Sequence, residues 1–254
     1  MIRSLQQKED ANMFPCRWWP RVDTLGTRKF EFKPGLNFIV GPNGSGKSTL
    51  TKTIARLFMA EQGGRQTITQ HSLSDMFNIC SKNNTFDSFE VDHDGGPVFY
   101  LNPEDTVGMQ YGQFDDDFFK EGFVSAGAKP SSGQKSTDGM NRLLNLIQEW
   151  ADGADNVDDR LGGRCNDLWQ ERIDRAMEFI KPDRRTPVII LDEPDSSVDL
   201  FGTIELFGLI RLCSESMQVI VNTHSPLALD MDANFIETVE GYIDDCRKKI
   251  DEQE

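Results

Sequence analysis

Residues 41–48 read GPNGSGKS, and this stretch decides the fold. It satisfies the pattern G-x-x-x-x-G-K-[ST], in which glycines let backbone N–H groups turn inward around phosphate. The apolar run 36–40 (LNFIV) precedes it, which predicts a strand. Four apolar residues at the spacing of one helical face follow it: Leu50, Ile54, Leu57 and Phe58. A phosphate-binding loop between a strand and a helix is the context that distinguishes a working site from a chance match.

The rest of the chain predicts an α/β fold of the P-loop NTPase type. Short apolar runs that predict buried strands occur at 98–101, 188–191 and 219–221. Periodic apolar residues predict helices over 140–147, 169–180 and 201–213, and the Gly/Asp-rich segment 151–165 reads as a loop. Such alternation predicts a mostly parallel central sheet covered on both faces. Residues 28–32 and 36–40, separated by a Lys-Pro-Gly turn, predict an N-terminal antiparallel β portion.

The chain length of 254 residues suits a single domain. We expect the core to comprise 28–58 and 186–240, with a peripheral helical lobe that also carries the signature loop over about 60–185. Residues 1–12 mix charges of both signs and read as a polar N-terminal arm without the apolar core of a signal peptide.

Composition excludes several classes of protein. The formal net charge of −15 does not support a broad nucleic-acid interface, because backbone binding needs clustered Lys and Arg, and it leaves only a local basic groove open. No apolar run is long enough to cross a bilayer, so we expect no membrane association and a cytoplasmic location. The 5 cysteines lie far apart, without the paired spacing of a zinc or iron–sulfur site.

The loop predicts the phosphate contacts of ATP. The Lys47 ammonium is placed to reach the β- and γ-phosphates, and the Ser48 hydroxyl is a candidate Mg²⁺ ligand. The N-terminus of the following helix adds partial positive charge. The residues predicted to bind ATP here are Gly41, Pro42, Asn43, Gly44, Ser45, Gly46, Lys47, Ser48 and Thr49.

Two adjacent carboxylates follow the apolar run 188–191. Asp192 is a candidate Mg²⁺ ligand, and Glu193, one residue further, is a candidate catalytic base for the attacking water. An apolar strand that ends in Asp-Glu is often only a capped strand end, but its place downstream of a phosphate-binding loop favours the catalytic interpretation.

Three segments in this order, GPNGSGKST, VIILDEP and VIVNTHSP, resemble the ABC ATPase superfamily. The resemblance covers 28–58, 130–150 and 186–230, and the Thr-His-Ser-Pro after the last strand is similar to the soluble branch of RecF-like and SMC-like ATPases and overcoming-lysogenization-defect (OLD) nucleases. It implies a D-loop at 195–199 and a catalytic switch role for His224 at the γ-phosphate. It also implies an ATP-dependent homodimer in which each nucleotide lies between two subunits.

The resemblance also implies a signature loop that binds the partner subunit's ATP, and 130–134 (PSSGQ) is its best counterpart. This loop departs from the usual Leu-Ser-Gly-Gly-Gln at the proline and at the second serine, so a plain helix cap is the alternative interpretation. The ATP-binding residues predicted here are Ser131, Ser132, Gly133 and Gln134.

The sequence does not decide which residues fill two further positions that the family implies. The glutamine that senses Mg²⁺ in family members has four competing positions: Asn102, Glu104, Gln110 and Gln113. An aromatic residue that stacks on adenine could be Trp18 or Trp19, but paired tryptophans are as often core or partner surface.

We therefore expect an ATPase whose ATP-dependent dimerisation acts as a switch or clamp for a partner effector, such as a nuclease or toxin in DNA maintenance or phage defence. The alternative is the nucleotide-binding subunit of an ABC transporter. Gly133 and Asp192 lie 59 positions apart (192 − 133), whereas in transporter subunits the signature helix runs almost directly into the second motif, and this disfavours the alternative. A small-molecule kinase would need neither the D-loop nor the switch histidine.

Overall fold

The computed structural model describes residues 1–9, 25–61, 64–70, 72–73, 88–103, 132–155, 157–161, 167–180, 185–196 and 198–252. Among these residues, no helix is both long enough and apolar enough to cross a membrane.

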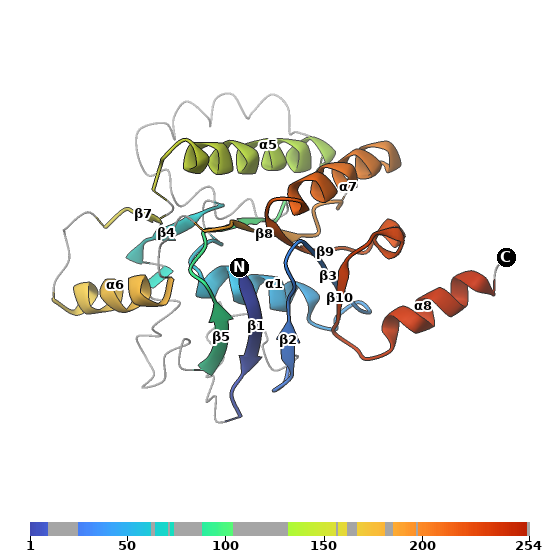
Figure 1. Ribbon diagram of the computed structural model, residues 1–254, viewed down its shortest axis with the longest axis horizontal. Coiled ribbons are helices and arrows are strands. Elements are labelled where there is room, and N and C mark those ends of the chain that lie inside the picture. Colours follow the sequence, from blue (N-terminus) through green and yellow to red (C-terminus); the bar gives the residue numbers. More distant parts are fainter. Residues whose placement is uncertain are drawn as a thin grey trace.

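A sheet of five parallel strands forms the centre of the molecule (Figure 1). In spatial order its strands are β10 (Asn234–Glu237), β3 (Leu36–Val40), β9 (Gln218–Asn222), β8 (Val188–Asp192) and β6 (Val98–Leu101). The register places Asp192 opposite Asn222, and Leu101 opposite Leu191. The predicted parallel sheet is confirmed, and the carboxyl ends of its strands meet at one edge.

A second sheet, in the order β2-β1-β5, is antiparallel. It contains β1 (Ile2–Gln7), β2 (Lys29–Glu31) and β5 (Phe89–His93). The expectation of a polar N-terminal arm was therefore wrong over Ile2–Gln7. Ile2 and Leu5 are buried, but an irregularity in the register between Ile2 and Ser4 places them three residues apart, so the sequence lacks the regular alternation that indicates a strand. The predicted antiparallel portion exists, but β2 pairs with β1, whereas β3 joins the central sheet.

Helices cover both faces of the central sheet. In Figure 1, α5 (Ser132–Ala151) and α7 (Leu200–Ser214) lie above it, and α1 (Lys47–Leu57) lies below it. The remaining elements are α6 (Asp167–Ile180), the short helix η3 (Pro226–Asp230), α8 (Tyr242–Asp251), and the paired strands β4 (Gln66–Ile68) and β7 (Val157–Asp159). Strand β7 lies within the segment that was expected to be a loop.

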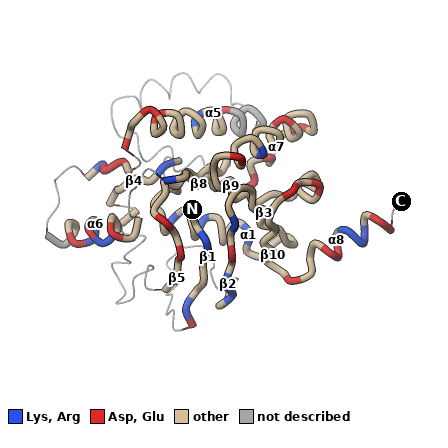
Figure 2. The backbone as a smooth tube through the Cα atoms, viewed as in Figure 1, with Lys and Arg blue, Asp and Glu red and all other residues tan. Residues whose placement is uncertain are grey.

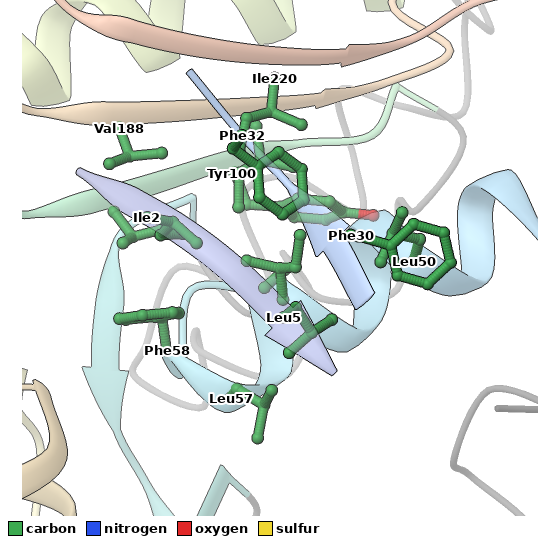
Figure 3. Close-up of a cluster of buried hydrophobic side chains, with 14 of the residues drawn as sticks. Ile2, Leu5, Phe30, Phe32, Leu50, Leu57, Phe58, Tyr100, Val188 and Ile220 are labelled. Carbon is green, nitrogen blue, oxygen red and sulfur yellow. The ribbon is translucent and has the colours of Figure 1, made fainter. Parts of the chain in front are cut away.

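Alternation along the central strands divides the core into two layers. Ile39, Ile190 and Ile220 point into the layer that contains α1 and the antiparallel sheet, part of which is drawn in Figure 3. Phe38 and Leu191 point into the opposite layer, which contains α5 and α7. Burial on both faces explains why the strands read as continuous apolar runs.

Two glycines give opposite expectations for stability. The backbone of Thr186 lies close to Gly96, and a Cβ added to Gly96 would lie only 2.3 Å from the Thr186 carbonyl oxygen. We expect Gly96→Ala to lower the free energy of unfolding by about 1–3 kcal/mol. Gly208 lies inside α7 with open space around it, and Gly208→Ala should raise the free energy by about 0.5–1 kcal/mol. Chemical denaturation of both variants measures these changes, and an equal response would contradict the packing described.

Candidate functional site

The site lies at the carboxyl edge of the central sheet, where β3, β8 and β9 end side by side. The phosphate-binding loop follows β3, Asp192 ends β8, and Asn222 ends β9. Ligands of open α/β sheets bind at this edge. The parallel register therefore gathers residues that are far apart in the sequence.

The loop turns into α1 through glycines with left-handed backbone. Gly44 has φ 76°, and Gly46, the N-cap of α1, has φ 95°, a region that favours glycine. The first N–H groups of a helix have no partner within the helix, and they face the loop together with the positive end of the helix dipole. This arrangement suits an anion such as a phosphate group.

Thr238, just after β10, supports the other side of the loop. Its hydroxyl lies 2.5 Å from the Ser45 hydroxyl and donates to the Val40 carbonyl oxygen at 3.1 Å. A Cβ on Gly41 would lie 1.9 Å from the Thr238 hydroxyl oxygen, so only glycine fits there. Neither this contact nor the identity of Thr238 was foreseen from the sequence.

Lys47 is buried, with only 4% of its surface exposed. Its ammonium donates to the carbonyl oxygens of Gly41 and Pro42, at 2.9 and 3.1 Å. Burial lowers the pKa of Lys47, and the charges of Glu193 and Asp192 oppose that shift. The Lys47 ammonium has lost most of its hydration by burial. A phosphate group bound in the loop would stabilise its charge in place of the lost water.

Asp192 and Ser48, the two predicted Mg²⁺ ligands, are joined by Asn222. The Asn222 side-chain amide donates to the Asp192 carboxylate at 2.6 Å and to the Ser48 hydroxyl at 3.0 Å. On the other side, Asn102 donates to the second carboxylate oxygen of Asp192 at 3.1 Å. The predicted ligands are therefore close together and held by amides.

Glu193 has left-handed backbone with φ 52°, which is uncommon for a residue other than glycine. Its N–H donates to the Asn222 carbonyl oxygen at 2.8 Å, so the turn is anchored to β9. The Glu193 carboxylate accepts from Ser48 at 3.4 Å and lies 3.6 Å from His224 Nε2. Uncommon backbone at a carboxylate of this kind is typical of functional sites.

The segment after Glu193 connects the predicted D-loop to the histidine turn. Asp195 accepts from the Thr223 hydroxyl at 2.9 and 2.8 Å. Asp199 is the N-cap of α7 and accepts from Gly202 N–H at 2.8 Å. Thr223, the residue before His224, is thus hydrogen-bonded to Asp195 of the predicted D-loop. This contact holds the two segments together.

Other predicted residues are only partly placed. Ser131 lies outside the described residues, and Ser132, Gly133 and Gln134 form the first residues of α5. Of the four candidates for the sensor position, only Asn102 is described, and it contacts Asp192. The remaining candidates for the Mg²⁺-sensing position and for adenine stacking lie outside the described residues: Glu104, Gln110, Gln113, Trp18 and Trp19.

Asn222 contacts both predicted Mg²⁺ ligands, and these contacts were not predicted from the sequence. It was quoted within the motif around His224, but it was given no role of its own. The available signal was its position directly after three apolar strand residues, Val219 to Val221, in a strand parallel to the one that ends in Asp192. The pairing register of β8 and β9, which places Asp192 opposite Asn222, is needed to predict the contact.

The oxygen atoms of Ser48 and Asp192 suit Mg²⁺ better than a metal ion that is coordinated entirely by protein side chains. No group of three or more His, Cys, Asp or Glu residues that could hold a metal is present among the described residues. Mg²⁺ is usually held by one or two protein oxygens plus substrate phosphates. The neighbouring Ser48 hydroxyl and Asp192 carboxylate match this pattern.

Two family models match the chain. A family described as "AAA domain" matches residues 23–184, which is more than half of the chain. A second family, described as "AAA domain, putative AbiEii toxin, Type IV TA system", matches residues 172–230. Together these matches include the phosphate-binding loop, Asp192, Glu193 and His224.

Curated relatives also resemble the chain. The phosphate import ATP-binding protein PstB of Pyrococcus furiosus is 26% identical over 210 residues, covering 80% of this chain and 74% of the relative. The PstB of Thermococcus kodakarensis is 27% identical over 203 residues, with coverage of 80% and 74%. The DNA double-strand break repair Rad50 ATPase of Nanoarchaeum equitans is 51% identical over 43 residues, or 17% of this chain and 5% of the relative.

Similar solved structures include an ATP-binding cassette of an ABC transporter in its ADP conformation, with a TM-score of 0.36 and 15% identity, covering 96% of this chain and 94% of the other. A bacterial Atm1-family ABC exporter with ATP bound has a TM-score of 0.40 and 17% identity, covering 98% and 40%.

Replacing Lys47 tests the phosphate-binding loop. Methionine preserves most of the buried stem but removes the charge, so we expect Lys47→Met to fold and to lose at least about tenfold in ATP affinity, since a hydrogen bond to a charged group contributes about 1.5–3 kcal/mol. Binding of a fluorescent ATP analogue measures the loss, and circular dichroism checks the fold. Unchanged affinity in a folded variant would contradict the assignment of the loop.

Proposed function

The chain belongs to the AAA domain family of ABC-type P-loop ATPases, and from this premise we propose that it binds ATP with Mg²⁺ and hydrolyses it to ADP and phosphate. The observation that supports this proposal is the convergence of five side chains at one sheet edge. Ser48 contacts Glu193, Glu193 contacts His224, and Asn222 links Ser48 to Asp192. Lys47 is buried beside the two carboxylates.

Each residue has a role in this proposal. Lys47 exchanges its loop carbonyl contacts for the β- and γ-phosphate oxygens. Ser48 and Asp192 would hold Mg²⁺, which would supply positive charge that offsets the negative charge of the phosphate groups. Glu193 accepts a proton from the attacking water, and a carboxylate at the edge of the phosphate site suits this task. His224, whose side chain is 46% exposed, contacts the γ-phosphate and orients Glu193.

We further propose that ATP drives formation of a homodimer. Lys47 and Asp192 are buried at the bottom of the site, whereas Glu193 and His224 are partly exposed at its rim. A second subunit related by two-fold symmetry covers both rims with one interface. In this arrangement Ser131 and the first residues of α5, Ser132, Gly133 and Gln134, bind the partner's nucleotide. Because ATP is abundant there, we place this cycle in the cytoplasm.

The dimer cycle is proposed to act as a switch or clamp for a protein effector, a nuclease or toxin, in DNA maintenance or phage defence. The family match that names the AbiEii toxin and a type IV toxin–antitoxin system supports the defence role. The short similarity to a Rad50 ATPase supports the DNA maintenance role. Figure 2 shows acidic and basic residues interspersed along the described chain, and the basic stretch within α8 has acidic residues on both sides, so we assign contact with nucleic acid to the effector.

A second candidate function is the nucleotide-binding subunit of a transporter. The observation that favours it is the similarity to PstB proteins over 80% of this chain. A permease gene beside this gene would support transport, whereas a nuclease or toxin gene would support the switch. Stable co-purification with that neighbour's product, from membranes or from the soluble fraction, then distinguishes the two.

Glu193→Gln tests the assignment of the base. The amide keeps the shape and hydrogen bonding of the side chain but accepts no proton, so hydrolysis should fall by about 10²–10⁴-fold while ATP binding is retained. Phosphate release and analogue binding measure the two effects. Wild-type turnover in this variant would transfer the base role to another residue, and His224 is the nearest candidate.

Light scattering with and without ATP tests the dimer. We expect monomers without nucleotide and a closed dimer for Glu193→Gln with ATP, because blocked hydrolysis traps the closed state. Repulsion between two chains that each carry a net charge of −15 is largely screened beyond about 8–10 Å, so moderate salt should not abolish the dimer.

The matched control combines Glu193→Gln with Ser131→Arg, which adds bulk to the loop before α5. This double variant should bind ATP at each half-site but remain monomeric. If it dimerises as readily as the single variant, the start of α5 is only a capped helix and the nucleotide-covering surface lies elsewhere.

A further inference from the structure

Three neighbouring strands of the central sheet place an amide on each side of Asp192. Strands β6, β8 and β9 are adjacent and parallel, and Asn102 follows β6, whereas Asn222 ends β9. Asn222 is the more deeply placed of the two amides, with none of its surface exposed, and it lies opposite Asp192 in the register. Its side chain is therefore fixed between two strands rather than presented on a loop.

The orientation of the Asn222 amide follows from its partners. An ionised carboxylate only accepts hydrogen bonds, so the nitrogen of Asn222 must face Asp192. The same nitrogen lies 2.6 Å from Asp192 Oδ1 and 3.0 Å from Ser48 Oγ. One NH₂ group thus spans the two predicted metal ligands, which come from β8 and from the start of α1.

The carbonyl oxygen of the same amide is buried and has no hydrogen-bond partner in the described structure. An unpaired buried acceptor is unfavourable, so its presence needs an explanation. This oxygen shares a carbon with the nitrogen that contacts Ser48 and Asp192, so it lies beside the site. Mg²⁺ usually keeps several water molecules, and these are donors that would reach the site with the nucleotide.

We propose that Asn222 is a positioning residue that fixes the Ser48 hydroxyl and the Asp192 carboxylate relative to each other, and so sets the affinity of the site for Mg²⁺. This inference rests on the proposed function, since it concerns the same Mg-ATP site. It makes a separate claim, namely that the metal dependence of nucleotide binding is set by a neutral amide that is not itself a predicted ligand. Outer partners of this kind commonly change metal affinity by about 10–100-fold.

Asn37 provides a matched comparison within the same sheet. It is also fully buried, but it lies near the amino end of β3, away from the site. Its amide donates to the carbonyl oxygens of Lys33 and Gly35 at 2.8 and 3.1 Å, and its own oxygen accepts from Lys33 N–H at 2.8 Å. The donors of Asn37 thus contact backbone carbonyl oxygens, and its oxygen also accepts from the Asn234 side chain at 3.0 Å, whereas Asn222 uses its donors on two side chains of the site.

The experiment measures binding of a fluorescent ATP analogue as MgCl₂ is raised from zero in metal-free buffer. Asn222→Leu keeps the branched shape and removes both polar atoms, and Asn222→Ala serves if the leucine variant does not fold. We expect the Mg²⁺ concentration at half-maximal binding to rise about 10–100-fold, with analogue affinity in EDTA changed far less. The control Asn37→Ala should lower thermal stability and leave this Mg²⁺ concentration at the wild-type value.

Two results would overturn the inference. One is a folded Asn222 variant with the wild-type Mg²⁺ requirement, and the other is an equal loss of affinity with and without Mg²⁺, which indicates general damage to the site. Failure of the proposed function looks different, because the wild-type protein itself would then bind no ATP analogue at any Mg²⁺ concentration.

Discussion

The parallel pairing of β3, β9 and β8 is the constraint on which the rest of the structure depends. Parallel strands have their carboxyl ends at the same edge of the sheet. The pairing of the strands therefore brings the phosphate-binding loop, Asp192 and Asn222 together, and no long loop is needed to do so. The same pairing requires cover on both faces of the sheet. The antiparallel sheet and α1 supply one cover, while α5 and α7 supply the other.

Electrostatics divides the site into a buried half and an open half. Lys47 and Asp192 have exposures of 4% and 1%, and their opposite charges lie where the phosphates and the metal are proposed to bind. Burial of the Lys47 ammonium lowers its pKa, so a nearby anion such as a phosphate group would stabilise the charged form. The proposed binding of a charged nucleotide would thus depend on this local environment, although the chain as a whole is strongly acidic.

Sequence reasoning recovered the elements whose signal is local. The loop pattern and the helical spacing of Leu50, Ile54 and Leu57 predicted α1, and continuous apolar runs predicted β6, β8 and β9. It failed where partners are distant in the sequence. Strand β1 reads as a polar arm because its two buried residues, Ile2 and Leu5, are three positions apart and the other residues are polar, and its pairing with β2 and β5 is not visible in the sequence. Thr238 and Asn222 were missed for the same reason, since each acts through a contact with a residue more than a hundred positions away.

The open half of the site explains why chemistry and assembly belong together in the proposed cycle. Glu193 and His224 have side-chain exposures of 35% and 46%, so bulk water reaches the proposed base in a single chain. Electrostatic stabilisation of a transition state is strongest where water is excluded. Asp195, tied to Thr223, connects the rim to the segment that leads into α7, so a partner that covers the rim also contacts the turn that carries His224. A covering subunit would therefore exclude water and orient the histidine in one step, which makes hydrolysis depend on assembly.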